Sequence, residues 1–331
     1  MSLTTTARKR LADQALSRPT TVRRRAIPWR VYAALLVASV LWASLYSAGK
    51  PAVAATGAIQ VTSCRVLLAF ACLGLLTVVR GGGHLLGEQL RMHWRAIIVL
   101  GLLNFGASQL LALSALNFLP ASVNGVLNNT HPLWVAIGTA VVYPPRRPGA
   151  LIAGSVVAVT GVALVFLPDL TSDLSAGMPT LSVLGVALSL GGSGVIAGGT
   201  IIGRRVMPSS DPIALSALAS GAAIIPMALL TMLNGGFGPI LEASATIKVL
   251  LLYLGVGCTA TNFALWYYGL KYLPAAAASA FQYLIAPLGV VLAAIFLGEP
   301  LTGTLLLGTV CIVIGLVTTQ IALAPGLLKR R

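Results

Sequence analysis

The chain has 331 residues, of which 57% are hydrophobic and 9% charged, whereas soluble domains usually contain about 25% charged residues. This composition excludes a water-soluble globular protein and indicates that most of the chain lies in lipid. The formal net charge is +15. The basic residues lie at the ends and between apolar runs, not in a stripe interleaved with stacking aromatics, so no nucleic-acid partner is expected.

The chain begins with a basic segment. Residues 1–30 contain eight Arg and Lys residues and are followed by an apolar run that continues to Gly49. No convincing small-residue cleavage site follows this run, so we expect an uncleaved first membrane span behind a basic cytoplasmic tail.

Apolar runs of membrane-spanning length fill the rest of the chain. We divide them at charges, prolines and glycine clusters. In hydrocarbon every backbone N–H and C=O needs a partner within the protein, so runs of this length are predicted to be helices. The ten predicted spans are about 31–49, 58–79, 96–116, 121–142, 150–167, 181–203, 212–233, 247–270, 275–297 and 302–323.

The basic residues predict the orientation of these spans. If the N-terminus is cytoplasmic, all but three of the 22 Lys and Arg residues fall in cytoplasmic segments; the exceptions are Lys50 and Lys248 outside and Arg65 within the second span. This distribution obeys the positive-inside rule. We therefore expect a multi-pass protein of the cell (inner or plasma) membrane with both termini in the cytoplasm.

A long-period repeat links the two halves of the sequence. The step Leu119–Ala121 recurs 154 residues later as Leu273–Ala275, and each step precedes a span that contains a proline. Two glycines recur with the same offset: Gly154 and Gly161 reappear as Gly308 and Gly315. The sequence therefore predicts an internal duplication.

Five spans per copy is an odd number, so the second copy enters the membrane from the opposite side. The predicted fold class is an all-α integral membrane protein with ten transmembrane helices in two inverted five-helix repeats, an arrangement typical of secondary transporters. The expected domains are a cytoplasmic tail (1–30), a first repeat (31–168), an extracytoplasmic linker (169–180), a second repeat (181–323) and a basic cytoplasmic C-terminus (324–331).

Several short stretches carry a family resemblance. They are Leu41–Ser44, Arg65, the two Leu-Pro-Ala steps, Leu297–Leu301, Gly308 and Gly315. Over about residues 31–323 the chain resembles the drug/metabolite transporter superfamily in its ten-helix EamA-domain form. The resemblance implies a proton- or gradient-driven carrier, often an exporter of amino acids or other metabolites, with a cavity between its halves. Where the family commonly repeats a Gly-Glu step in the first half, this chain has Val142–Arg146, so no carboxylate is expected there.

Polar and aromatic side chains within the spans are the candidates for substrate binding. Asn124 and Asn128 lie one helical turn apart, as do Trp42 and Tyr46. These amides either line a cavity or hold helices together by hydrogen bonds. Hydrogen bonds between membrane helices average only ~0.6 kcal/mol, so helix association alone would not explain so many amides, and a cavity is favoured. The aromatics line a pocket or belong to an interfacial belt. The full candidate set is Trp42, Tyr46, Arg65, Asn104, Ser108, Asn124, Asn128, Asn262, Trp266, Gln282 and Tyr283.

Two ionisable residues are predicted to lie within spans. Burying Arg65 costs at least ~2.5 kcal/mol on insertion scales, so this residue either extends to the membrane surface or offsets the charge of a substrate carboxylate. His131 is the candidate for proton coupling because an unperturbed imidazole changes charge near neutral pH, with helix packing as the alternative. Outside the spans, Lys50 is read as an interfacial anchor or a gating residue, and Glu299 as a cap for the helix that follows Pro300.

No motif indicates an enzyme. The sequence lacks HExxH, a phosphate-binding Gly-Lys-Ser loop and Gly-x-Ser-x-Gly, and its four cysteines show no metal-ligand spacing. No cofactor or metal is expected. The sequence predicts a secondary active transporter, in the export direction, with a small-molecule substrate, the lipid bilayer and a coupling proton as partners, acting as a monomer or homodimer. The alternatives are a non-transporting scaffold or sensor and a flippase-like carrier of lipid-linked cargo.

Overall fold

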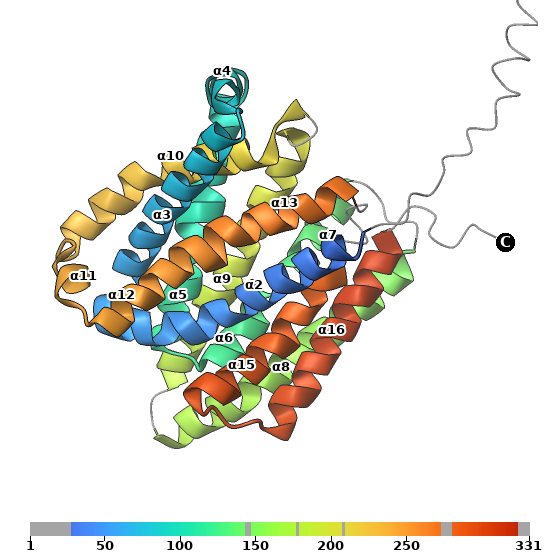
Figure 1. Cartoon of the computed structure of the whole chain (residues 1–331). Coiled ribbons are helices and arrows are strands. Elements are labelled where there is room, and N and C mark those ends of the chain that lie inside the picture. Colours follow the sequence, from blue (N-terminus) through green and yellow to red (C-terminus); the bar gives the residue numbers. More distant parts are fainter. Residues whose placement is uncertain (1–27, 143–146, 177–178, 207–208, 273–279, 324–331) are drawn as a thin grey trace, which may run out of the picture.

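The computed structural model describes residues 28–142, 147–176, 179–206, 209–272 and 280–323. Within these residues every regular element is a helix (Figure 1). The helices are α2 (Trp29–Thr56), α3 (Ala58–Val79), α4 (Gly83–Leu100), η1 (Gly101–Ala107), α5 (Ser108–Ser114), η2 (Ala115–Asn117), α6 (Ala121–Asn128), α7 (His131–Val142), α8 (Pro148–Ala176), α9 (Pro179–Val206), α10 (Pro212–Leu233), α11 (Gly238–Glu242), α12 (Ala245–Leu252), η4 (Tyr253–Thr261), α13 (Asn262–Tyr272), η5 (Ala280–Leu284), α15 (Ile285–Leu297) and α16 (Gly303–Leu323).

The predicted fold class is confirmed: each predicted span corresponds to one helix or to a run of consecutive helices. Seven helical stretches are long and apolar enough to cross a membrane, and shorter apolar helices follow near the C-terminal end of the described chain. The third span consists of α4, η1, α5 and η2, and the eighth consists of α12, η4 and α13. The long runs of the sequence are thus membrane helices, several of them irregular.

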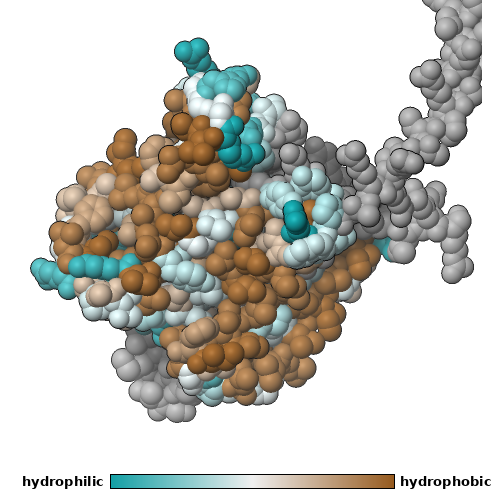
Figure 2. Space-filling view, in the orientation of Figure 1, coloured by the Kyte–Doolittle hydropathy of each residue, from teal (hydrophilic) through white to brown (hydrophobic). Residues whose placement is uncertain are grey.

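The outer surface of the helices is apolar. Large side chains such as Leu75, Ile225 and Phe296 are 64%, 79% and 70% exposed. Exposing so much apolar surface to water would cost free energy, whereas contact with lipid does not. Figure 2 shows apolar residues over most of one face, with hydrophilic residues gathered near the end of α4. The surface is therefore built for contact with lipid.

α2 and α8 extend furthest beyond the predicted C-terminal ends of their spans. The first span was expected to stop at Gly49, but α2 continues through Pro51 to Thr56 and ends at Gly57, whose φ is +91°. Proline is tolerated inside membrane helices because neighbouring groups satisfy the freed carbonyl. α8 continues to Ala176, into the segment assigned to the linker. The domain boundaries stay predictions; most of the N-terminal tail, the C-terminus and the second Leu-Pro-Ala step lie outside the described residues.

The last helices of the two halves, α8 and α16, lie side by side (Figure 1). A Cβ built on Gly154 would lie 2.8 Å from the carbonyl oxygen of Gly315, and one on Gly161 would lie 2.6 Å from that of Gly308. The converse distances, from Gly308 to Gly161 and from Gly315 to Gly154, are 2.7 and 2.6 Å. The repeated glycines therefore meet one another, and they let two antiparallel backbones touch directly.

Both halves contain a π-helical segment at corresponding places, η1 in the third span and η4 in the eighth. A π-turn leaves backbone carbonyls without their usual helical partner. In η1 the Asn104 carbonyl accepts a hydrogen bond from Ser108 Oγ at 2.9 Å, and in η4 the Leu254 carbonyl accepts one from Thr259 Oγ1 at 2.8 Å. The duplication is thus visible in the backbone irregularities as well as in the sequence.

The glycine contact predicts which glycine substitutions destabilise the protein. Gly161→Ala places a methyl group against the backbone of α16 and is expected to cost about 1–3 kcal/mol, because neither backbone can yield easily. Gly194→Ala is the matched control, since a Cβ there meets nothing within 4 Å. Thermal unfolding of both variants in detergent measures the difference; equal melting temperatures would contradict the assigned packing.

Candidate substrate cavity

A cavity of about 370 Å³ lies between helices of the two halves. Residues of α2, η1, α5, α6 and α7 line it from the first half, and residues of α9, α10, α13, η5 and α15 line it from the second. Small-molecule sites typically have volumes of about 300–1,000 Å³, so this cavity has room for a small metabolite.

One wall of the cavity is aromatic. The ring centroids of Trp42 and Trp266 lie 5.5 Å apart, and Phe263 meets Trp42 edge-on at 6.0 Å with an interplanar angle of 85°. Phe105 lies 5.2 Å from Phe263 and extends the wall toward η1. Edge-to-face and tilted pairs of this kind form rigid apolar surfaces. The wall therefore suits an aromatic ring or an aliphatic side chain.

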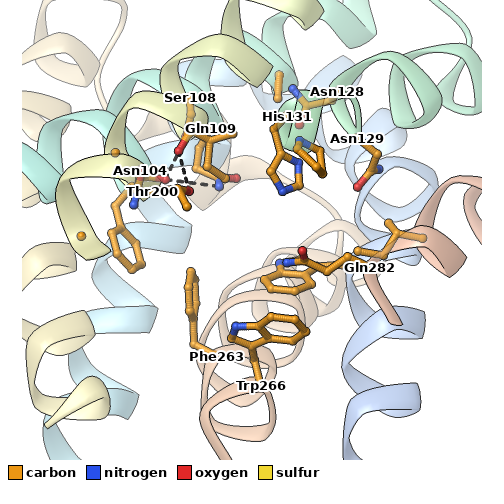
Figure 3. Close-up of a pocket in the computed structure, with 18 of the residues that line it drawn as sticks. Asn104, Ser108, Gln109, Asn128, Asn129, His131, Thr200, Phe263, Trp266 and Gln282 are labelled. Atoms are coloured by element: carbon orange, nitrogen blue, oxygen red, sulfur yellow. Dashed lines mark hydrogen bonds between the residues drawn. The ribbon is translucent and has the colours of Figure 1, made fainter. Parts of the chain in front are cut away.

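A second wall is polar and is built on the π-helical turn. Figure 3 shows Asn104, Ser108, Gln109 and Thr200 together on one side of the cavity, across from Phe263 and Trp266. A Cβ on Gly199 would overlap the Asn104 amide, so this glycine leaves the space that the amide occupies. Asn104 Oδ1 is buried and has no hydrogen-bond partner among the described residues.

A third group of polar side chains lies where the fourth span breaks between α6 and α7. Asn128 Oδ1 accepts a hydrogen bond from Tyr46 Oη at 2.9 Å, and Asn128 Nδ2 donates to the Ser189 carbonyl at 3.1 Å. The Asn128 amide is therefore held in a fixed orientation. Asn129 and His131 line the cavity just beyond it (Figure 3).

The structure brings most of the predicted site residues to the cavity. The lining contains Trp42, Tyr46, Asn104, Ser108, Asn128, His131, Trp266, Gln282 and Tyr283. Their roles in binding stay predictions. Three predicted residues do not line it: Arg65, Asn124 and Asn262. The Asn124 amide donates to the Ala112 carbonyl at 2.8 Å, and Asn262 is 0% exposed with neither amide atom partnered among the described residues.

Arg65 lies behind the polar wall. Its side chain is 3% exposed and does not extend toward a helix end. Nη1 donates to Gln109 Oε1 at 2.7 Å, while Nε and Nη2 donate to Thr259 Oγ1 at 3.3 and 3.1 Å. Arg65 therefore connects α3 to α5 and η4, and it reaches the cavity only through Gln109.

Sequence reasoning missed several lining residues. They are Phe105, Thr200, Ser216 and Phe263. Gln109 and Asn129 also line the cavity, and they belong to the polar side chains of the third and fourth spans for which the sequence favours cavity lining. Gln109 and Asn129 each follow a predicted residue directly, and in a regular helix adjacent residues point in different directions. The π-turn before Gln109 and the helix break at Asn129 change those directions. A polar residue within an apolar run was the only signal available.

A polar cluster closes one end of the helix bundle beyond the cavity. Glu299 accepts hydrogen bonds from the backbone N–H groups of Ala121 and Ser122 at 2.7 and 2.9 Å and from Ser122 Oγ at 2.5 Å. Lys50 Nζ lies 3.5 Å from Glu299 Oε1 and donates to the Leu119 carbonyl at 3.1 Å. The expectation that Glu299 caps the helix after Pro300 is wrong: it caps α6, because the loop before α16 passes the start of α6.

This cluster favours the ionised form of Glu299. Burial by itself would raise the pKa of the carboxyl, but the hydrogen bonds from Ser122 and Ala121 and the nearby charge of Lys50 outweigh it. The net effect lowers the pKa of Glu299 below its ordinary value. Glu299 thus joins the loop between α15 and α16 to α6 and to α2 as an anion.

Two segments of the chain, residues 29–167 and 183–320, match the family model described as "EamA-like transporter family". The chain belongs to this family. The resemblance to the drug/metabolite transporter superfamily is confirmed, and the protein is a multi-pass membrane transporter for a small molecule. Each matched segment covers one half of the chain, in agreement with the duplication.

Similar proteins carry transporter names. The chain is 26% identical over 210 residues to a "Probable amino-acid metabolite efflux pump" of Escherichia coli (strain K12), covering 61% of this chain and 68% of that protein. It is 25% identical over 274 residues to "Uncharacterized transporter YvbV" of Bacillus subtilis (strain 168), covering 83% and 86%. A solved crystal structure that is 20% identical matches with a TM-score of 0.63 over 88% of this chain and 98% of that chain, which shows the fold alone.

The Glu299 cluster predicts a pH-dependent contribution to stability. Glu299→Gln is expected to lower stability by about 1–3 kcal/mol at pH 7, because the charge-assisted hydrogen bonds weaken. The wild-type pKa is lower when folded than the ordinary value of about 4.3. The stabilisation is therefore fully present above that pH and disappears as the pH falls through the folded pKa.

Thermal unfolding of the wild type and of Glu299→Gln across pH 3 to 8 measures this effect, with buffers spaced at about one unit. Glu242→Gln is the control, since Glu242 is exposed in α11 and its substitution should change little. A constant difference between wild type and Glu299→Gln down to the lowest pH would contradict the assignment.

Proposed function

We propose that the protein is a secondary active exporter of small amphipathic metabolites, with amino acids as the leading class. The observation that carries this proposal is the cavity between the two halves, in which the aromatic wall of Trp42, Phe263 and Trp266 faces the polar wall of Asn104 and Gln109. An amphipathic molecule presents one group to each wall. A relative named for amino-acid metabolite efflux adds support to the substrate class.

Transport then proceeds by alternating access between the halves. The lining reaches Leu100, Gly203 and Leu215, toward the end of the bundle opposite Glu299. The distribution of basic residues assigns the Glu299 end to the outside and both termini to the cytoplasm. In this assignment the cavity extends toward the cytoplasm, the side from which an exporter takes up its substrate.

A proton is the coupling ion of the proposal, and His131 is its acceptor. His131 lines the cavity at the break between α6 and α7. Imidazole exchanges a proton in the physiological range. None of the described residues that line the cavity is Asp or Glu, so the lining contains no carboxylate that could carry the proton in place of His131.

The aromatic wall predicts a change in substrate affinity. Trp266→Ala is expected to raise the KM for transport by about tenfold, the equivalent of losing 1–2 kcal/mol of ring contact. Trp134→Ala is the matched control, because Trp134 is 40% exposed on α7 and does not line the cavity. Flux into proteoliposomes, with a thermal-shift screen of amino acids and amines to find the substrate, measures both variants.

Three results of that screen separate the candidate functions. A compound that stabilises the protein and crosses the membrane under a gradient supports a carrier. Stabilisation without flux, in protein shown to be folded after reconstitution, would replace the carrier with a sensor. Equal KM values for Trp266→Ala and Trp134→Ala would place the substrate away from the aromatic wall.

The assignment of His131 predicts a separation of coupling from binding. His131→Gln is expected to abolish uptake driven by an imposed pH gradient, because the side chain that carries the proton is gone. Substrate counterflow, which needs no net proton movement, should continue. His84→Gln, at an exposed residue of α4, is the control. Gradient-driven flux that persists in His131→Gln would rule out His131 as the proton acceptor.

A further inference from the structure

Arg65 carries a buried positive charge without a carboxylate partner in the described part of the chain. Among the described residues the one ion pair joins Lys50 and Glu299. The guanidinium instead meets two neutral oxygens, Gln109 Oε1 and Thr259 Oγ1. A buried charge without a counter-ion is costly, so a ligand that supplies negative charge nearby is favoured.

The hydrogen bond from Arg65 fixes the orientation of the Gln109 amide. A guanidinium only donates, so the amide must present its oxygen to Arg65. The Gln109 amide nitrogen then points the other way, where it lies 3.4 Å from the Asn104 carbonyl. That nitrogen has two hydrogens, and Gln109 lines the cavity. One N–H is therefore available to a ligand, and polarisation by Arg65 strengthens it as a donor.

We propose that Gln109 binds the carboxylate of the transported molecule through its amide N–H, and that Arg65 is the positioning residue that makes this site select anionic groups. This inference rests on the proposed function and narrows its substrate class to carboxylates. Arg65 does not touch the ligand. It holds the amide and supplies the positive potential behind it.

No charged side chain in the described cavity lining counteracts the positive potential of Arg65. No Asp, Glu, Lys or Arg lies among the described lining residues, so Arg65 is the charge nearest to the polar wall that the structure describes. Because the Arg65 side chain is 3% exposed, water screens its charge little over the one intervening amide. The Gln109 N–H and the positive charge behind it therefore suit a carboxylate group.

Gln109→Glu is the decisive variant. Glutamate has nearly the same shape, keeps an oxygen for Arg65 and forms an ion pair with it, so the variant is expected to fold. It also removes the N–H donor and neutralises the charge. The probes are L-phenylalanine, L-phenylalaninamide and phenethylamine, which share ring and amine and differ in the carboxylate. We expect the wild type to bind the acid at least about tenfold more tightly than the other two, and Gln109→Glu to lose this preference.

Two substitutions of Arg65 separate positioning from structure. Arg65→Lys keeps the charge and should retain part of the preference for the acid, whereas Arg65→Gln removes the charge and should abolish it. A merely structural Arg65 would lower the affinity for all three probes in parallel. The readout is therefore the ratio of dissociation constants, with circular dichroism and size-exclusion profiles confirming that each variant is folded.

The outcomes distinguish the inference from the proposed function. Equal affinity of the wild type for acid, amide and amine, or an unchanged ratio in Gln109→Glu, would overturn the inference and leave the transporter proposal standing. Preferential binding of the acid without flux into proteoliposomes would contradict the proposed function and leave the inference in place. Failure of the wild type to bind any of the three probes would overturn both the carboxylate site and the amino-acid class.

Discussion

The direct contact between the backbones of α8 and α16 is the constraint on which the rest of the structure depends. Helices in lipid gain little from the hydrophobic effect and associate through close packing. Gly154 and Gly161 meet Gly315 and Gly308 with no side chain between them, so the two halves touch backbone to backbone along this antiparallel pair of helices. The remaining helices of each half are then placed around a shared space, and the cavity lies there instead of being filled by side chains.

Irregular backbone occurs in the spans that line this space. The π-helices η1 and η4 and the break between α6 and α7 lie in spans that contribute to the cavity wall. Backbone groups freed within a membrane need other partners, and here side chains of the same helices supply them, as Ser108 does for the Asn104 carbonyl. The departure from regular helix geometry is what turns amides such as Asn104 and Gln109 toward a common wall.

The membrane spans were predictable because hydrocarbon imposes a length and a composition on the sequence. The site was predictable in part: helical spacing placed Trp42 with Tyr46, and all of the chosen aromatic residues line the cavity. Spacing does not fix the rotation of a helix about its axis, so Asn124, one turn from Asn128, faces the Ala112 carbonyl instead. The end of α2 was not predictable because the tolerance of Pro51 within a membrane helix depends on neighbouring groups. The partners of Glu299 depend on a contact between segments 177 residues apart.

The cap that Glu299 places on α6 has an energetic consequence for the empty carrier. A residue of the second half satisfies backbone donors of the first, and separating them leaves those donors and a carboxylate to find water. In the proposed alternating-access cycle, this cap favours the conformation in which the two halves meet at Glu299 when no substrate is bound, and that conformation would limit the leak of protons and solutes. In that cycle a substrate shifts the protein toward the conformation in which this contact is broken only if it binds that conformation more tightly, so the strength of the cap would set how large this difference in affinity must be.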